Sequence, residues 1–124
     1  AFRDEEELPK GEFIAPALTE AISESKVYVP IFSLHYAGSK WCLQELAQMV
    51  ECWKAGQGGK GQPIFLPVFY KIDPRCVRHP EIEPYKAAFE EHDRKHDART
   101  VPAWKKALQV VGKMKGWHIT ELDE

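Results

Sequence analysis

The sequence lacks the features that mark several common classes of protein. Three cysteines, Cys42, Cys52 and Cys76, are an odd number at spacings that match neither a disulfide framework nor a zinc site. This usage fits a reducing compartment. The longest apolar run, residues 63–70, is much shorter than the roughly 20 residues needed to span a bilayer, and no signal peptide is visible. We expect a soluble chain without a metal site or a membrane partner.

No charge of one sign dominates the chain. The 17 basic and 19 acidic residues are interspersed and give a formal net charge of -2. No basic stripe of the kind that follows a phosphate backbone is present, so nucleic acid is not the expected partner. Internal repeats are also lacking. A chain of 124 residues with 44% hydrophobic residues has room for one core, and we treat residues 1–124 as one domain.

The apolar residues follow two alternating patterns. Helical spacing occurs in four segments, residues 12–25, 39–55, 84–92 and 101–115. Near-continuous apolar runs at 27–32 and 63–70 are typical of strands covered on both faces of a parallel sheet, although each contains a proline that speaks against full pairing. Residues 117–119 are a candidate last strand. The alternation predicts an α/β fold with ligand sites at the carboxyl ends of its strands.

Glu45 stands out in the second predicted helix. With Cys42 at zero on a helical wheel, the apolar arc runs from about -20° to about 100°, and Glu45 falls near -60°. Glu45 therefore lies on the border of the buried face, with Trp41 one turn before it. A cleft carboxylate beside an aromatic wall fits this position, and so does a solvated glutamate near a helix start.

Other residues suggest competing chemistry. Cys42 lies in the first turn of the same helix, where the dipole favours a thiolate, and His35 is a conceivable base for a cysteine hydrolase; the alternative is a core cysteine. His92 and His96 have the spacing of a metal pair, but the residues between them are charged, and we expect a solvated helix end. The glycine-rich segment 56–61 follows a helix and precedes a strand, the reverse of a phosphate-binding loop.

Several segments together resemble the TIR domains of plant disease-resistance receptors, especially those like the flax rust-resistance proteins. The matching residues are Phe2-Arg3-Asp4, Leu8-Pro9-Lys10-Gly11, Ala21-Ile22-Ser23-Glu24-Ser25-Lys26, Tyr36-Ala37-Gly38-Ser39-Lys40-Trp41-Cys42-Leu43-Gln44-Glu45-Leu46, Leu66-Pro67-Val68-Phe69-Tyr70, Asp73-Pro74, Val77-Arg78, Trp104-Lys105-Lys106-Ala107-Leu108 and Lys115-Gly116-Trp117-His118-Ile119. They occur in order along essentially the whole chain.

The resemblance implies a flavodoxin-like parallel sheet with flanking helices, the TIR fold, and cleavage of NAD+ at the nicotinamide–ribose bond. NAD+ is then the substrate, and no separate cofactor is expected. The family pattern makes Glu45 the catalytic carboxylate, puts Ser39 and Trp41 in the nucleotide pocket, and makes the loop from Asp4 to Gly11 its neighbour. It also assigns Cys42 to a nucleic-acid-hydrolysing synthetase activity of some members, so nucleic acid remains a conceivable substrate.

The same resemblance implies self-association between TIR domains that signals plant immune cell death. It also implies attachment to the other domains of an NLR receptor and a cytoplasmic or nucleocytoplasmic location. The family's first strand and first helix have no counterpart here, and the chain stops before the family's last helix. We therefore expect residues 1–124 to form a partial TIR domain that folds poorly alone. The strand at 27–32 should lack a neighbour, with apolar side chains facing a gap.

The enzymatic function has one main rival. Some TIR domains act as non-catalytic interaction modules that signal by docking alone. These adaptor domains commonly lack the arrangement Trp-Cys-x-x-Glu, which is intact here from Trp41 to Glu45. The sequence therefore favours the NAD+ glycohydrolase, with the homotypic interaction module as the alternative.

Overall fold

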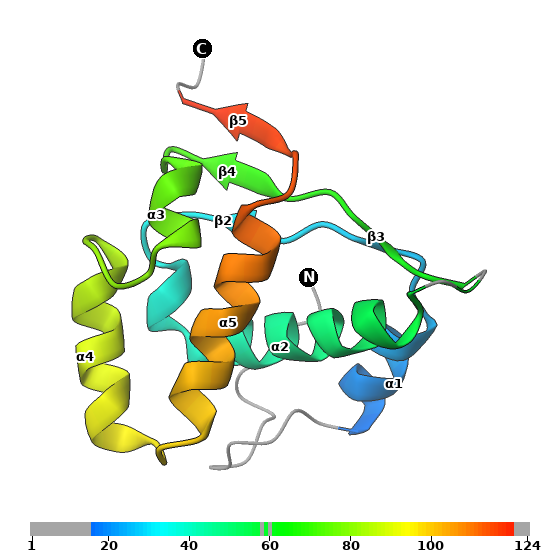
Figure 1. The fold of residues 1–124 in the computed structure, drawn as a ribbon, viewed down its shortest axis with the longest axis horizontal. Coiled ribbons are helices and arrows are strands. Elements are labelled where there is room, and N and C mark those ends of the chain that lie inside the picture. Colours follow the sequence, from blue (N-terminus) through cyan, green and yellow to red (C-terminus); the bar gives the residue numbers. More distant parts are fainter. Residues whose placement is uncertain (1–15, 58, 60, 121–124) are drawn as a thin grey trace.

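The computed structural model describes residues 16–57, 59 and 61–120. In chain order its elements are α1 (Pro16–Glu24), β1 (Val27–Tyr28), β2 (Ile31–Phe32), the 3-10 turn η2 (Tyr36–Gly38), α2 (Lys40–Ala55), β3 (Ile64–Phe65), β4 (Val68–Tyr70), α3 (Pro74–Arg78), α4 (Tyr85–Lys95), α5 (Thr100–Gly112) and β5 (Trp117–Ile119). Strands and helices alternate (Figure 1), and every described strand pair is parallel. The predicted α/β fold class is confirmed.

The two long predicted strands each appear as two short ones separated by a proline. β1 pairs with β3, and β4 lies between β2 and β5. The ladder nevertheless continues through the breaks, because the carbonyl of Tyr28 accepts from the amide of Leu66 at 2.8 Å and the carbonyl of Pro30 accepts from the amide of Val68 at 2.9 Å. A proline removes a donor and keeps its acceptor. The expected interruption of pairing is confirmed, and its effect is small.

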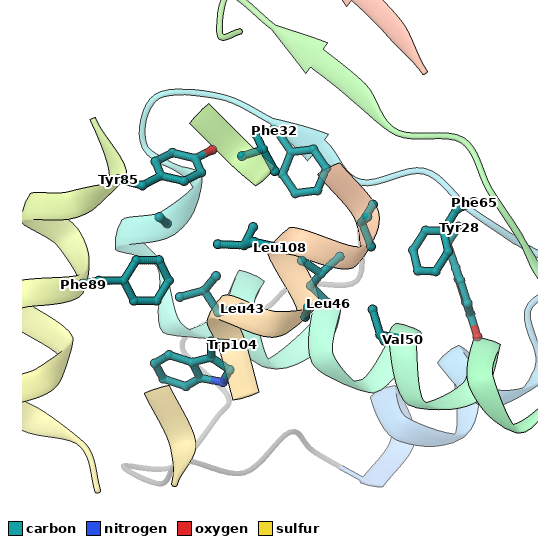
Figure 2. Close-up of a cluster of buried hydrophobic side chains, with 14 of the residues drawn as sticks. Tyr28, Phe32, Leu43, Leu46, Val50, Phe65, Tyr85, Phe89, Trp104 and Leu108 are labelled. Carbon is teal, nitrogen blue, oxygen red and sulfur yellow. The ribbon is translucent and has the colours of Figure 1, made fainter. Parts of the chain in front are cut away.

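The sheet buries one face. Aromatic side chains from alternate positions of the strands point into the core, where Phe32 stacks on Phe69 at 5.7 Å between ring centroids. Figure 2 shows this cluster with the leucines of α2 and α5. Most intervening positions are exposed, among them Ile31 at 56% and Trp117 at 63%, whereas Val68 in β4 is buried at 8%.

One expectation about residues 27–32 is wrong for the part of the chain that the structure describes. Coverage of both faces does not hold, because Val27, Val29 and Ile31 are exposed there. The strand period of two sends these side chains to the face opposite the core. The expected lack of a neighbouring strand stays a prediction, since residues 1–15 lie outside the described part.

Helix α2 lies between α1 and α5, and it contacts both. Leu43, Leu46 and Val50 form its core face, and Leu108 of α5 packs among them (Figure 2). In the first half of α2, four consecutive residues from Leu43 to Leu46 are buried. One apolar stripe would bury fewer.

The helix predictions are confirmed with shifted ends. The segment expected at 12–25 is helical from Pro16 to Glu24, and residues 12–15 lie outside the described part. The sequence did not predict α3, a short helix that begins at Pro74 after Asp73, whose Oδ1 accepts from the amide of Arg75 at 2.9 Å. Among the described residues, no helix has the length and apolar character to cross a membrane.

Candidate functional site

The start of α2 is fixed by its capping residue. Ser39 has an extended backbone, and its Oγ accepts a hydrogen bond from the amide of Cys42 at 3.2 Å. An N-cap of this kind satisfies one of the amides that a helix leaves unpaired at its start. The predicted pocket residue Ser39 therefore has a structural task as well.

Glu45 is more deeply placed than its position on the helical wheel predicts. Its side chain is 8% exposed, and Leu43 and Leu46 on either side of it are fully buried. Burial of an ionisable carboxyl costs free energy unless the group is hydrogen-bonded or paired. The structure thus places a buried acid in the second turn of α2.

Trp41 lies one helical turn before Glu45 and is half-buried. The Nζ of Lys40 lies 4.7 Å from the centre of the Trp41 indole ring, a cation–π distance. Ser39, Trp41 and Glu45 thus occupy the capping residue and the first two turns of one helix. The other two predicted site residues, Asp4 and Gly11, lie outside the described residues.

The hydrolase centred on Cys42 remains a prediction. Cys42 is half-buried, and its carbonyl accepts from the hydroxyl of Tyr36 at 3.3 Å. His35, the conceivable base, is exposed at the residue before η2. No group of three or more side chains suited to hold a metal ion occurs among the described residues.

A hollow of about 380 Å³ lies between the start of α2 and helix α4. Its lining includes Gly38 and Lys40 on one side and His92, Lys95 and His96 on the other. Trp41 and Glu45 do not line it. The hollow is therefore next to the candidate site but separate from it.

The prediction of a solvated helix end at His92 is wrong. His92 is 6% exposed, and its ring lies 5.2 Å from the ring of Trp104 in an edge-on arrangement. Its Nε2 lies 2.8 Å from the carbonyl oxygen of Ala37. Burial lowers the pKa of His92, although the bond to the Ala37 carbonyl opposes this shift. The signal for burial was available, because His92 shares the apolar face of its helix with Tyr85 and Phe89.

Tyr85 makes a second contact of this kind that the sequence did not predict. Its ring is fully buried, and its hydroxyl donates to the carbonyl of Ser33 at 2.7 Å. Burial raises the pKa of Tyr85 far above its usual range. The hydroxyl is therefore protonated, and able to donate, throughout the physiological pH range.

The fold and the helix-borne acid define an α/β domain with a parallel sheet and a buried carboxyl near the start of a central helix. All 124 residues match the family described as TIR domain. The chain belongs to the TIR domain family.

The chain is similar to plant disease resistance proteins. It is 39% identical over 120 residues to disease resistance protein RPV1 of Vitis rotundifolia, which covers 97% of this chain and 8% of that protein. It is 36% identical over 117 residues to TMV resistance protein N of Nicotiana glutinosa, covering 93% of this chain and 10% of that protein. The chain thus spans about a tenth of the length of these relatives.

A solved structure confirms the TIR fold. The TIR domains of the activated Roq1 resistosome, which directly recognises the pathogen effector XopQ, superpose with a TM-score of 0.76 at 34% identity. The match covers 94% of this chain and 68% of that chain.

Proposed function

We propose that this domain cleaves NAD+ at the nicotinamide–ribose bond and that Glu45 is its catalytic carboxylate. The observation that carries the proposal is the burial of Glu45 on α2, one turn after Trp41. This TIR domain has the arrangement Trp-Cys-x-x-Glu, and the acid of that arrangement is removed from bulk water. Both features favour a catalytic TIR domain over a non-catalytic adaptor. A low-dielectric site strengthens the attraction between a carboxylate and a developing positive charge.

The reaction needs little proton transfer. As the bond between nicotinamide and C1′ of the ribose breaks, its electron pair goes to the pyridinium nitrogen, and nicotinamide leaves as a neutral molecule. No general acid is needed, in contrast to ordinary glycosidases, where a sugar oxygen must be protonated. Water then adds at C1′ and releases a proton, giving ADP-ribose.

In this proposal Glu45 has two tasks. It accepts hydrogen bonds from the ribose hydroxyls, and its negative charge stabilises the oxocarbenium-like transition state. Trp41 forms a wall of the pocket and Ser39 contributes a hydroxyl at its edge. NAD+ is the substrate, and the mechanism uses no other cofactor.

The proposed setting is immune signalling in the cytoplasm or nucleocytoplasm of a plant cell, with other receptor domains attached. The relatives are named disease resistance proteins, and the matched structure is an activated resistosome. We propose that this domain likewise self-associates and that cleavage of NAD+ depends on the assembly. Turnover per molecule should therefore rise with protein concentration.

The test compares two isosteric substitutions on one helix in the natural protein that carries this chain. Glu45→Gln removes the charge of the buried carboxyl, and Glu51→Gln does the same at an exposed position of α2. Nicotinamide release should fall by about 100-fold or more in Glu45→Gln, as for other transition-state electrostatic contacts, and should be unchanged in Glu51→Gln. Full turnover in a folded Glu45→Gln protein would refute the proposal.

The second candidate is a non-catalytic module that signals by self-association alone. The match to assembled TIR domains favours it, because docking needs no catalytic acid. The same variants separate the candidates. If the Glu45→Gln protein still assembles and still signals cell death, the proposal of a non-catalytic module is correct. If it assembles but no longer signals, the proposal of an enzyme is correct.

A further inference from the structure

Helix α4 is attached to the segment before α2 by two side chains. Tyr85, in the first turn of α4, donates to the carbonyl of Ser33 at 2.7 Å. His92 lies seven residues later, two turns along the same face, and its Nε2 is 2.8 Å from the carbonyl oxygen of Ala37. The two bonds thus engage the backbone carbonyls of two residues that lie four positions apart in the chain.

The direction of the second bond is fixed by its partner. A carbonyl oxygen only accepts, so Nε2 of His92 carries the proton and donates it. The ring itself is fixed, with ring centroids 5.5 Å from Phe89 and 5.2 Å from Trp104. Both donors are therefore held by rigid, buried rings.

The segment that receives these bonds leads directly into the candidate site. Within this segment the amide of Tyr36 donates to the carbonyl of Ser33, and the amide of Ser39 donates to the carbonyl of Tyr36, both at 3.2 Å. Each bond closes a turn. Ser39 then caps α2, which carries Trp41 and Glu45. A shift of this segment would move the start of α2 and the candidate site with it.

We propose that Tyr85 and His92 are positioning residues, which hold residues 33–39 from α4 and so set where α2 presents its catalytic carboxylate. This inference rests on the proposed function for its kinetic consequence. Both residues lie on α4, and both act in this proposal through the backbone of residues 33–39. A displacement of about 1 Å far from the reacting atoms is enough to slow an enzyme by up to about 100-fold.

A matched control exists in the same fold. Tyr28 is also buried, and its hydroxyl donates to a backbone carbonyl, that of Ile22, at 2.7 Å. That bond joins β1 to the end of α1, and the same hydroxyl also contacts Cys52 near the end of α2, so both contacts lie away from residues 33–39. Tyr28→Phe and Tyr85→Phe therefore remove the same kind of hydrogen bond and leave the ring in the core, and only the second affects the segment before α2.

The kinetic test uses the natural protein. Tyr85→Phe should lower kcat for nicotinamide release by about tenfold with a smaller change in KM, and Tyr28→Phe should leave kcat within about twofold. His92→Phe should behave like Tyr85→Phe, and His92→Gln, whose amide can donate, should recover part of the loss. Because both bonds hold one segment, the double variant should lose less than the product of the single losses.

A second measurement needs no NAD+. Amide hydrogen exchange in residues 33–39 and the first turn of α2 should accelerate in Tyr85→Phe and His92→Phe, and stay unchanged in Tyr28→Phe. If the wild-type protein releases no nicotinamide while the exchange follows this pattern, the proposed function fails and the positioning of α2 stands. Equal exchange in Tyr85→Phe and Tyr28→Phe would overturn the positioning role, as would an unchanged kcat in both Tyr85→Phe and His92→Phe.

Discussion

Gly112 of α5 lies directly against the backbone of Arg78 in α3. A Cβ on Gly112 would come within 2.8 Å of the backbone nitrogen of Arg78. We expect Gly112→Ala to destabilise the domain by about 1–3 kcal/mol, because the two helices must separate to admit a methyl group. Urea denaturation measures this loss. Gly61→Ala is the control, since a Cβ there meets nothing within 4 Å; equal midpoints for the two variants would contradict the prediction.

The buried imidazole of His92 should make the domain sensitive to mild acid. Burial is the main cause of its lowered pKa, and the nearby His96 and Lys95 act in the same direction; the bond to the carbonyl of Ala37 and the charge of Asp93 act against it. In the unfolded chain a histidine has a pKa of about 6.5. Below that pH the unfolded state takes up a proton before the folded state does. The stability contributed by neutral His92 is therefore present above about pH 6.5 and is lost as the pH falls toward the folded pKa.

The measurement is the free energy of unfolding between pH 7.5 and about pH 5, a range kept above the carboxyl titrations. The slope against pH should flatten in His92→Gln. The control is His35→Gln, which changes an exposed histidine. A slope that is the same in wild type and His92→Gln would assign the acid sensitivity to other groups.

Ser39 allows its capping role to be separated from a role in the pocket. Ser39→Ala removes the acceptor for the amide of Cys42 and should cost about 1 kcal/mol of stability. Ser39→Asp restores a capping acceptor and should recover this loss. It also adds a negative charge, so if Ser39 faces the nucleotide, the KM for NAD+ should rise through repulsion of the pyrophosphate. Unchanged kinetics in Ser39→Asp would confine Ser39 to capping.

The exposed face of the sheet should dominate the behaviour of the isolated 124-residue chain. Ile64 is 57% exposed and Phe65 beside it is buried. We expect the isolated chain to bind a hydrophobic dye and to melt without a sharp transition. Ile64→Thr should reduce dye binding by the isolated chain. In the natural protein that carries this chain, Phe65→Ala should destabilise the domain by about 3–5 kcal/mol, because it empties part of the core. A cooperative melt of the isolated chain without dye binding would contradict this expectation.

The sequence predicted well those features that depend on local periodicity. The apolar spacing from Cys42 to Trp53 predicted α2, and the apolar runs predicted the strands, because a helix and a strand each repeat their side-chain direction at a fixed interval. Pro30 and Pro67 correctly indicated breaks. The sequence could not show that the carbonyl of Pro30 keeps the ladder continuous, because its partner Val68 is distant in the chain.

The candidate site was only partly predictable. Membership of the TIR domain family was visible in the ordered motifs, and Glu45 was visible as an acid near an apolar arc. Its burial was not, because one helical wheel describes contact with one neighbour, whereas α2 is covered from several sides. Similarly, the charged residues next to His92 predicted an exposed side chain, whereas the apolar face of its helix predicted a buried one. The structure shows that His92 packs against Trp104 and is buried.

By itself, then, the sequence determined the alternation of strands and helices, the family, and the residue types available for chemistry, since these follow from periodicity and motif order. Only the tertiary structure decided that α2 buries an acid and that apolar side chains on one face of the described sheet are exposed. It also decided that Tyr85 and His92 reach the carbonyls of Ser33 and Ala37. Those pairs are 52 and 55 residues apart in the chain. Contacts over such separations are set by how helices pack, which no local pattern encodes.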